Sequence, residues 1–376
     1  MEILKVCPRC GSAWQETKAI NGGPSEFWRE CSNPNCNSYY NTYIPQPHQT
    51  EFHKDNHRIT ANFGGYGSGK TLTSREEAYK HFFLTPNGNT LIGANVISQY
   101  EATLKREIEA DLPLAFVRSI SVIKNYIELI NGHRIMWRPF DDPDKLRSYN
   151  LTMFIILEAS EVKLSAFTQL RTRLRNTSAS TFKKDRNGNP VMEKVPGGGE
   201  VPIIDHDWRR GIIESNPDSG WIRDDVLLKS DEIYKHGSCC DEYVLLDNER
   251  DPYISTHVTS TDANRYLPKD FIAMNTKNKS PWWVNKYIFG SFLYSQGAVY
   301  PDVAKCITKP FDMKKHWKRI IAFDYGLVDP SVFLFGAIDE DENRLIIYKE
   351  AYEVDNNIEQ LAALYFQETK DSPSGG

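Results

Sequence analysis

A glycine-rich segment at residues 64–71, GGYGSGKT, carries the residues best suited to chemistry. It matches the pattern G-x-x-x-x-G-K-[ST] at every fixed position. In this pattern backbone N–H groups surround phosphate oxygens at a helix N-terminus, the lysine neutralises the β and γ phosphates, and the threonine hydroxyl reaches Mg²⁺. The residues expected to contact ATP are Gly64, Gly65, Gly67, Ser68, Gly69, Lys70 and Thr71, with Thr71 also serving the Mg²⁺ that accompanies the nucleotide.

The neighbours of this segment favour a phosphate-binding loop over a plain glycine-rich turn. A short apolar run at 58–63 precedes it and a helix-forming run follows it. Strand, loop and helix in this order are the context that the pattern requires. The sequence therefore predicts a nucleotide-binding strand–loop–helix unit.

A second candidate is Glu158, which ends the apolar run of MFIILEAS at 153–160. A carboxylate at the end of such a strand can polarise an attacking water or hold Mg²⁺ through water; alternatively, it only caps the following helix. Strands of this kind usually end in Asp followed by Glu, and here Leu157 stands at the Asp position. Because Mg²⁺ keeps several waters even in dedicated sites, we expect a working site with one substituted ligand, in which Glu158 is catalytic and Glu161 is the second choice.

Three arginines follow this strand in QLRTRLRN: Arg171, Arg173 and Arg175. Such a run can supply an arginine finger to the nucleotide of a neighbouring subunit, can touch DNA phosphates, or can simply form a solvated face.

Two further polar segments are candidates for nucleotide contact. Gln49, close to Gln46 and Phe52 in PQPHQTEF, can donate to and accept from the edge of adenine, although a surface loop explains the spacing equally well. Further along, Ser215 and Asn216 end the apolar strand of RGIIESNPDSGW. A polar pair at a strand end can sense the γ phosphate, or can belong to an ordinary turn.

Four of the seven cysteines cluster near the N-terminus. Cys7 and Cys10 lie two residues apart, and Cys31 and Cys36 follow with a spacing of four, each pair in a segment with Pro or Gly suited to a tight turn. Four thiolates in two such pairs can converge tetrahedrally on Zn²⁺. We therefore interpret residues 1–44 as a zinc ribbon rather than as incidental cysteines.

The remaining pattern must position these groups. A strand is expected at NTLIGAN, a long amphipathic helix at 98–112 and a hairpin with its turn at Asn131-Gly132, before the strand that ends in Glu158. Residues 176–206 look like a flexible surface insertion. Alternating helices and buried strands indicate an α/β fold with a doubly wound parallel sheet, whose ligands bind at the carboxyl ends of the strands.

The composition is that of an ordinary globular protein, and 376 residues suggest two or three domains. A net charge of −5 excludes a molecule that is basic all over, so any DNA contact must be a local patch. No apolar run approaches the roughly 20 residues of a membrane helix, and the N-terminus lacks the features of a signal peptide. We expect a soluble, intracellular protein.

Taken in order, these segments resemble the large terminase subunit of tailed bacteriophages, an ATPase and nuclease that packages DNA. The matching stretches cover most of residues 46–376: PQPHQTEF, GGYGSGKT, FIILEASEV with QLRTRLRN, GIIESNPDSGWIRD, STDANRYLP through GSFLYSQGAVYP, and IAFDYGLVDPSVFLFGAID. An ordered set of this kind is more specific than any single motif.

The resemblance implies roles for several residues. Glu158 would be the catalytic carboxylate, Ser215-Asn216-Pro217 the coupling motif, and Gln49 an adenine contact. Two departures from the family pattern are Leu157, in place of the usual magnesium-site Asp, and Tyr66, where many members have a basic residue. The second makes a trans-acting finger from the arginine run more plausible.

The C-terminal segment reads strand, turn, strand, turn, strand, helix, which opens the ribonuclease H-like fold. The first strand of that fold carries a metal-binding Asp, here Asp324. Two Mg²⁺ or Mn²⁺ ions need several carboxylates. Asp329, Glu350 and Glu359 are within reach in the sequence, but we expect the family's other acids to lie beyond residue 376 and the nuclease to be incomplete in this chain.

The resemblance also implies an organisation and partners. The expected domains are a zinc ribbon (1–44), a P-loop ATPase core of the ASCE type (45–245), a lid and linker (246–312) and the start of a nuclease domain (313–376). Double-stranded DNA, the portal protein, the small terminase subunit and other copies of the chain in a ring would be its partners. It would act in the host bacterial cytoplasm, transiently at the portal vertex of the procapsid.

Two alternatives remain beside a viral packaging motor. One is a zinc-bearing DNA helicase or translocase, which would need a second motor domain with further helicase motifs. The other is a nucleotide-binding scaffold that does not hydrolyse ATP, which Leu157 suggests directly.

Overall fold

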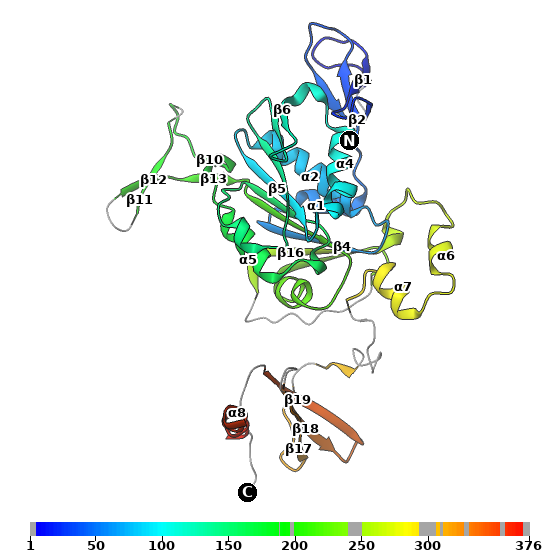
Figure 1. Cartoon of the computed structure of the whole chain (residues 1–376), viewed down its shortest axis with the longest axis vertical. Coiled ribbons are helices and arrows are strands. Elements are labelled where there is room, and N and C mark those ends of the chain that lie inside the picture. The colour runs from blue at the N-terminus through cyan, green and yellow to red at the C-terminus, as the bar shows by residue number, and fades with distance from the viewer. Residues whose placement is uncertain are drawn as a thin grey trace. The chain divides into compact units, whose positions relative to one another are not determined.

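The computed structural model describes residues 5–187, 189–195, 199–239, 250–292, 306–308, 311–326, 331–353 and 358–370. The chain divides into two compact units, Met1–Cys306 and Ile307–Gly376. Each unit has its own sheet, and the elements of the larger one carry the phosphate-binding motif (Figure 1).

A mixed sheet forms the centre of the larger unit. Its paired strands run parallel except at the edge, where β6 and β7 are antiparallel. The nine strands found in the described residues are, in spatial order, β15 (Ser230–His236), β16 (Asp251–Thr259), β4 (Ile59–Gly64), β14 (Arg210–Ser215), β9 (Met153–Ile156), β5 (Asn89–Ala94), β8 (Arg134–Pro139), β7 (Tyr126–Leu129) and β6 (Val117–Ser121). The predicted parallel sheet and the hairpin at Asn131-Gly132 are both confirmed.

Helices cover both faces of this sheet, because its central strands are apolar on both sides. On β14, Ile212 packs with residues of α1 (Pro47–Lys54) and α2 (Lys70–Leu84), while the next residue, Ile213, packs with α5 (Leu164–Arg173). The alternation of the two isoleucines shows the period of two that distinguishes the faces of a strand.

The predicted helix at 98–112 is broken. It consists of α3 (Ile97–Tyr100), a π-helical segment (Glu101–Lys105) and α4 (Arg106–Asp111), with Thr103 in a non-helical conformation at φ −116°, ψ −110°. The Thr103 hydroxyl donates to the Gln99 carbonyl at 2.6 Å. A threonine that bonds back to the preceding turn competes with the helix ladder and bends it, which the apolar pattern alone does not reveal.

The expected surface insertion at 176–206 contains paired strands. In the described part of it, β10 (Ser180–Phe182) pairs with β13 (Ile204–Asp207), and β11 (Met192–Val195) pairs with β12 (Gly199–Pro202). These two ribbons extend away from the central sheet in Figure 1.

The N-terminal cysteines lie beside a small antiparallel sheet of β1 (Trp14–Lys18), β2 (Pro24–Cys31) and β3 (Tyr39–Asn41), which itself contains Cys31. This sheet docks on the larger one through α4. The buried carboxylate of Asp111 accepts hydrogen bonds from the Ser25 hydroxyl at 2.8 Å and from the Phe27 N–H at 2.7 Å. Nearby, the ring of Trp28 meets Tyr79 and Phe116 edge-on.

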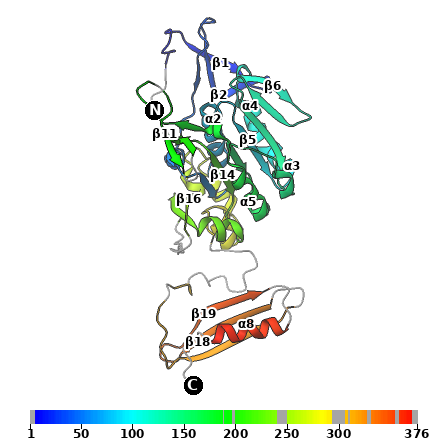
Figure 2. The same cartoon turned by 90° about the vertical axis from the view of Figure 1, so that its left-hand side faces the viewer.

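The smaller unit has the predicted order of strand, strand, strand and helix. β17 (Lys318–Asp324), β18 (Ser331–Asp339) and β19 (Arg344–Glu353) form an antiparallel meander, and α8 (Ile358–Lys370) packs on it through Leu361 (Figure 2). In the part of the chain that the structure describes, we find no helix with the length and apolar character needed to cross a membrane.

Candidate functional site

Three predicted site segments meet at the carboxyl edge of the central sheet. β14 lies between β4 and β9 and pairs in parallel with both, so the ends of these strands are neighbours. The glycine-rich loop follows β4, Glu158 follows β9, and Ser215 ends β14. The sheet therefore brings together segments that are far apart in the sequence, at the edge where α/β proteins bind ligands.

The loop conformation depends on its glycines. Gly69 precedes α2 with φ +90°, a left-handed conformation that side chains disfavour. At Gly64, a Cβ atom would lie 2.2 Å from the Thr259 carbonyl oxygen of neighbouring β16. These constraints explain why two fixed positions of the motif are glycine.

The Lys70 ammonium is held inside the loop. Its Nζ donates to the carbonyl oxygens of Gly64 and Gly65, both at 3.0 Å, and to Oδ1 of Asn216 at 3.2 Å. Burial lowers the pKa of Lys70, while the negative charges of Glu214 and Glu158 oppose this shift. The Lys70 ammonium thus donates to three oxygen acceptors, and phosphate would offer it acceptors of the same kind.

Glu214 is a site residue that we did not predict. The Thr71 hydroxyl donates to its Oε1 at 2.6 Å. The side chain is 6% exposed, and its second oxygen, Oε2, is buried without a hydrogen-bond partner among the described residues. In the sequence, Glu214 is distinguished only as a charged residue inside the apolar run RGIIES, which predicts an ordinary strand.

Glu158 adopts a strained turn directly after β9. Its backbone is left-handed at φ +48°, ψ +52°, a conformation that costs a residue with a side chain about 1–2 kcal/mol. Burial raises the pKa of Glu158, the Glu214 charge raises it further, and Lys70 opposes both. Strain and a raised carboxyl pKa at a strand end are both typical of functional sites.

The segment Ser215-Asn216 links the two sides of the site. The N–H of Ser160, in the turn after Glu158, donates to the Ser215 hydroxyl at 3.2 Å. The next side chain, Asn216, accepts from Lys70. The predicted coupling residues therefore contact both the phosphate-loop lysine and the turn that carries the candidate catalytic carboxylate.

Leu157 is buried, with an exposed fraction of 3%, in the apolar cluster that includes residues of α2. The side chain cannot bind a cation, so the usual carboxylate is missing from the position that directly follows β9.

The predicted adenine contact, Gln49, lies beside the loop. Its side chain is 1% exposed, its Oε1 accepts from the Gln46 N–H at 2.9 Å, and its Nε2 is buried without a hydrogen-bond partner among the described residues. A Cβ placed on Gly69 would lie 3.2 Å from that Nε2. Gln46 in turn donates to Asn264 at 2.7 Å.

A segment that contains α6 (Phe271–Thr276) and α7 (Pro281–Tyr287) supports the loop from outside the sheet. Tyr66, at the tip of the loop, stacks on Tyr287 with ring centroids 4.9 Å apart, and its N–H donates to the Tyr287 carbonyl at 2.7 Å. Lys286 forms an ion pair at 3.0 Å with Asp218, two residues after Asn216. The loop and the Ser215-Asn216 segment are thus both connected to α7.

The arginine run lies away from this edge. Arg171 pairs at 2.5 Å with Asp251, which begins β16, and Arg173 donates to the Arg147 carbonyl at 2.6 Å. Arg175 is exposed. Since Asp251 marks the amino end of its strand, the run lies at the edge opposite to the chain's own loop, and a finger role would require a neighbouring subunit.

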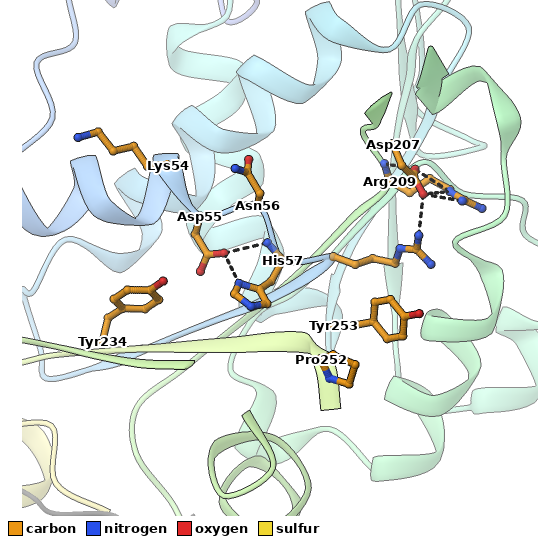
Figure 3. A pocket seen from close by; sticks show the side chains of 10 residues that line it. Lys54, Asp55, Asn56, His57, Asp207, Arg209, Tyr234, Pro252 and Tyr253 are labelled. Carbon is orange, nitrogen blue, oxygen red and sulfur yellow. Dashed lines mark hydrogen bonds and ion pairs between the residues drawn. The ribbon is translucent and has the colours of Figure 1, made fainter. Parts of the chain in front are cut away.

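A hollow of about 480 Å³ opens at that opposite edge of the sheet (Figure 3). Arg58 and Arg209, two of its cationic residues, both pair with the single carboxylate of Asp207, at 2.7 and 2.5 Å, which can balance only one of their charges. Asp55 accepts from His57 within the same hollow. The hollow holds none of the predicted nucleotide residues.

The four N-terminal cysteines are brought together as predicted. The sulfur atoms of Cys7, Cys10, Cys31 and Cys36 all lie within 4.8 Å of one another. Four thiols at this separation fit a tetrahedral zinc ion. Within the described residues, no other group of three or more His, Cys, Asp or Glu side chains is close enough to share a metal ion.

The nuclease candidates are only partly placed. Asp324 ends β17 and is exposed. In the strand register it aligns with Val332 and Glu350 aligns with Leu334, which puts both acids on one face of the sheet. Glu359 lies on α8, which packs on the other face through Phe333, and Asp329 lies outside the described residues.

Comparisons with known proteins agree with the resemblance seen in the sequence. A family model described as the phage terminase large subunit matches residues 56–194. The chain is also similar to the PBSX phage terminase large subunit of Bacillus subtilis (strain 168), with 25% identity over 303 residues, 77% of this chain and 63% of the relative. The match thus spans less than two thirds of that relative's length.

The solved structures that the chain matches include the large terminases of two bacteriophages. That of a thermophilic bacteriophage is 14% identical, with a TM-score of 0.49, covering 88% of this chain and 75% of that one. That of bacteriophage HK97 is 11% identical, with a TM-score of 0.44, covering 89% and 67%.

Proposed function

We propose, since this chain belongs to the phage terminase large subunit family, that it is the ATP-hydrolysing motor subunit of a DNA-packaging machine. The observation that carries the proposal is the meeting of Lys70, Thr71, Glu158 and Asn216 at one edge of the sheet. Lys70 would bind phosphate and the Thr71 hydroxyl would bind the metal ion. Glu158 would activate the attacking water, and Asn216 would sense the γ phosphate.

The loop residues would bind the triphosphate. Lys70 would exchange its bonds to the Gly64 and Gly65 carbonyls for bonds to phosphate oxygens. Bound Mg²⁺ would neutralise charge on the phosphates, and the Thr71 hydroxyl is the loop group placed to hold it. Gln49 would contact the adenine.

Glu158 would accept a proton from the attacking water or orient it. A base must be ionised to act, and a raised pKa makes the carboxylate a stronger base once it is ionised. Its position on a fixed turn, rather than on a long loop, would hold the carboxylate in one place.

Ser215-Asn216 would transmit the loss of the γ phosphate. Asn216 contacts Lys70, Ser215 contacts the Glu158 turn, and Asp218 pairs with Lys286 of α7. A shift of Lys70 on hydrolysis would therefore reach α7, which belongs to the proposed lid at 246–312.

The remaining parts would serve DNA and assembly. The core at 45–245 would be a P-loop ATPase of the ASCE type, residues 1–44 a zinc ribbon, and residues 313–376 part of a ribonuclease H-like nuclease, to which they contribute Asp324. Double-stranded DNA would be gripped through its phosphates, with the portal protein, the small terminase subunit and further copies of the chain as partners. In a ring, the arginine run would approach the nucleotide of a neighbouring subunit.

A nucleotide-binding scaffold that does not hydrolyse ATP is the second candidate, and the buried Leu157 favours it. DNA-stimulated ATP turnover of the purified chain, measured alone and with portal assemblies, distinguishes the two. The motor predicts turnover that Lys70→Ala abolishes. Zero turnover under both conditions, with nucleotide binding intact, would support the scaffold.

A further inference from the structure

Glu214 occupies a specific place in the sheet relative to Leu157. The strand register pairs Ile212 with Ile155 and Ile213 with Ile156, so the next position brings Glu214 beside Leu157. Both side chains point to the face covered by α2, because Ile212 and Leu157 belong to the same apolar cluster there. The carboxylate is one strand away from the position where a magnesium-site Asp usually stands.

The contacts of Glu214 are those of a cation ligand. One oxygen accepts from the hydroxyl of Thr71, the loop residue placed to serve Mg²⁺. The other oxygen is buried without a hydrogen-bond partner among the described residues. A purely structural role, as an acceptor for Thr71, accounts for the first oxygen only, and a buried carboxylate oxygen left unpaired is costly.

The donor set fits the ion. A hydroxyl and a carboxylate oxygen side by side, at the start of a phosphate-binding helix, are the hard oxygen ligands that Mg²⁺ prefers alongside phosphate and water. The structure offers no other carboxylate in contact with Thr71 among the described residues.

We propose that Glu214 supplies the carboxylate that Leu157 lacks and, together with Thr71, holds the Mg²⁺ of the bound nucleotide, directly or through water. This rests on the proposed ATP-binding function. The acidic ligand lies on β14 instead of directly after β9, and Glu158 is left to act on the water. Because β14 continues into Ser215-Asn216, the metal ligand and the γ-phosphate sensor would share one strand end.

The test is a Mg²⁺ titration of binding of a fluorescent, non-hydrolysable ATP analogue to the full chain. Glu214→Gln keeps the shape of the side chain but removes its charge. Loss of a metal-positioning group typically weakens metal affinity by about 10–100-fold, and we expect a loss in this range with unchanged affinity for the analogue in EDTA. Glu193→Gln, an exposed site in β11, is the matched control and should behave as wild type.

Relocation gives an independent check. Glu214→Leu combined with Leu157→Asp places the carboxylate directly after β9. On a logarithmic scale, this double variant should recover at least half of the Mg²⁺ affinity that Glu214→Gln loses. Leu157→Asp alone leaves Glu214 in place and should change Mg²⁺ affinity less than tenfold. Thermal unfolding of each variant shows whether it is folded, and the single Leu157→Asp variant tests the proposal even if Glu214→Gln does not fold.

Two results would overturn the proposal. Wild-type Mg²⁺ dependence in folded Glu214→Gln, or a gain of tenfold or more in Leu157→Asp, would show that Glu214 does not serve the metal while leaving ATP binding intact. Failure of the wild-type chain to bind the analogue at all would overturn the proposed function, and this inference with it.

Discussion

The docking of the N-terminal sheet on the central sheet of the larger unit depends on one buried carboxylate, Asp111. Its side chain is fully buried, and Oδ1 accepts from the Phe27 N–H at 2.7 Å and lies 2.8 Å from the Ser25 hydroxyl. The Ser25 hydroxyl is also 2.6 Å from the Asp111 carbonyl oxygen, so its single proton is shared. In an estimate of the free energy of docking, only the hydrogen bond from Phe27 is therefore counted in full.

Asp111→Ala should weaken docking by about 3 kcal/mol. A hydrogen bond to a charged group contributes roughly 1.5–3 kcal/mol, and the Phe27 N–H, which is partly buried, would lose its acceptor. The partial pairing with Arg75, at 4.0 Å, would also be lost. Since about 1.4 kcal/mol corresponds to a factor of ten, opening of the N-terminal sheet should increase about a hundredfold.

Hydrogen exchange measures this opening directly at the amides of β2, with zinc present throughout. Asp111→Asn keeps an acceptor oxygen and should show a smaller effect, and Asp144→Asn, at an exposed acid, should show none. Wild-type protection of β2 in Asp111→Ala would contradict the idea that this carboxylate anchors the sheet.

Three further predictions follow from the site and the cysteines. Burial raises the pKa of Glu158 and the charge of Glu214 raises it further, so the acid limb of the pH profile of ATP turnover should lie at a higher pH than for an ordinary carboxyl. Glu214→Gln at saturating Mg²⁺ removes a negative charge and lowers the pKa of Glu158. It should therefore move the acid limb to lower pH, and by more than Glu161→Gln does. A limb that does not move would contradict this electrostatic coupling. Removal of zinc with a chelator, or Cys7→Ser, should unfold β1–β3 and abolish the near-ultraviolet dichroism of Trp14 and Trp28, whereas Cys306→Ser at an exposed position should not; intact dichroism without zinc would refute a structural metal. Asn216→Ala removes one hydrogen bond to the Lys70 ammonium, and a bond to a charged group contributes about 1.5–3 kcal/mol, so ATP affinity should change by no more than about a hundredfold while turnover should be uncoupled from DNA stimulation; normal stimulation would argue against its role as a sensor.

The sequence predicted the elements that local rules determine. The strand–loop–helix unit around residues 64–71 could be predicted because Gly64, Gly69, Lys70 and Thr71 have fixed spacing. The cysteine cluster could be identified for the same reason, and the structure brings its sulfur atoms together. The hairpin at Asn131-Gly132 was predictable because its turn requires a left-handed Gly132.

Glu214 could not be identified in the same way. Its role depends on which strand lies beside β9 and on which face carries α2, and both are properties of the folded sheet. The order β4-β14-β9 places it next to Leu157, although 57 positions separate the two residues in the sequence numbering. Sheet order is set by packing of distant segments, which periodicity does not encode.

Other differences have local physical causes that the pattern also concealed. The apolar repeat at 98–112 is helical, but the hydroxyl of Thr103 bends the chain. From the sequence alone, Asp111 would be placed on the surface at the end of that helix. In the structure it is buried, because Ser25 and Phe27 of a distant strand are its hydrogen-bond partners. The arginine run is suitable for a finger by composition, yet in the structure Arg171 pairs with Asp251, away from the chain's own loop.

The most direct test of the central claim is a comparison of ATP binding and ATP hydrolysis in Glu158→Gln. The variant keeps the size of the side chain and removes the base, so we expect ATP affinity within about threefold of wild type and DNA-stimulated turnover reduced by at least about a hundredfold, as for the loss of a general base. Equal turnover in wild type and Glu158→Gln would contradict the assignment of Glu158 as the catalytic carboxylate of an ATPase.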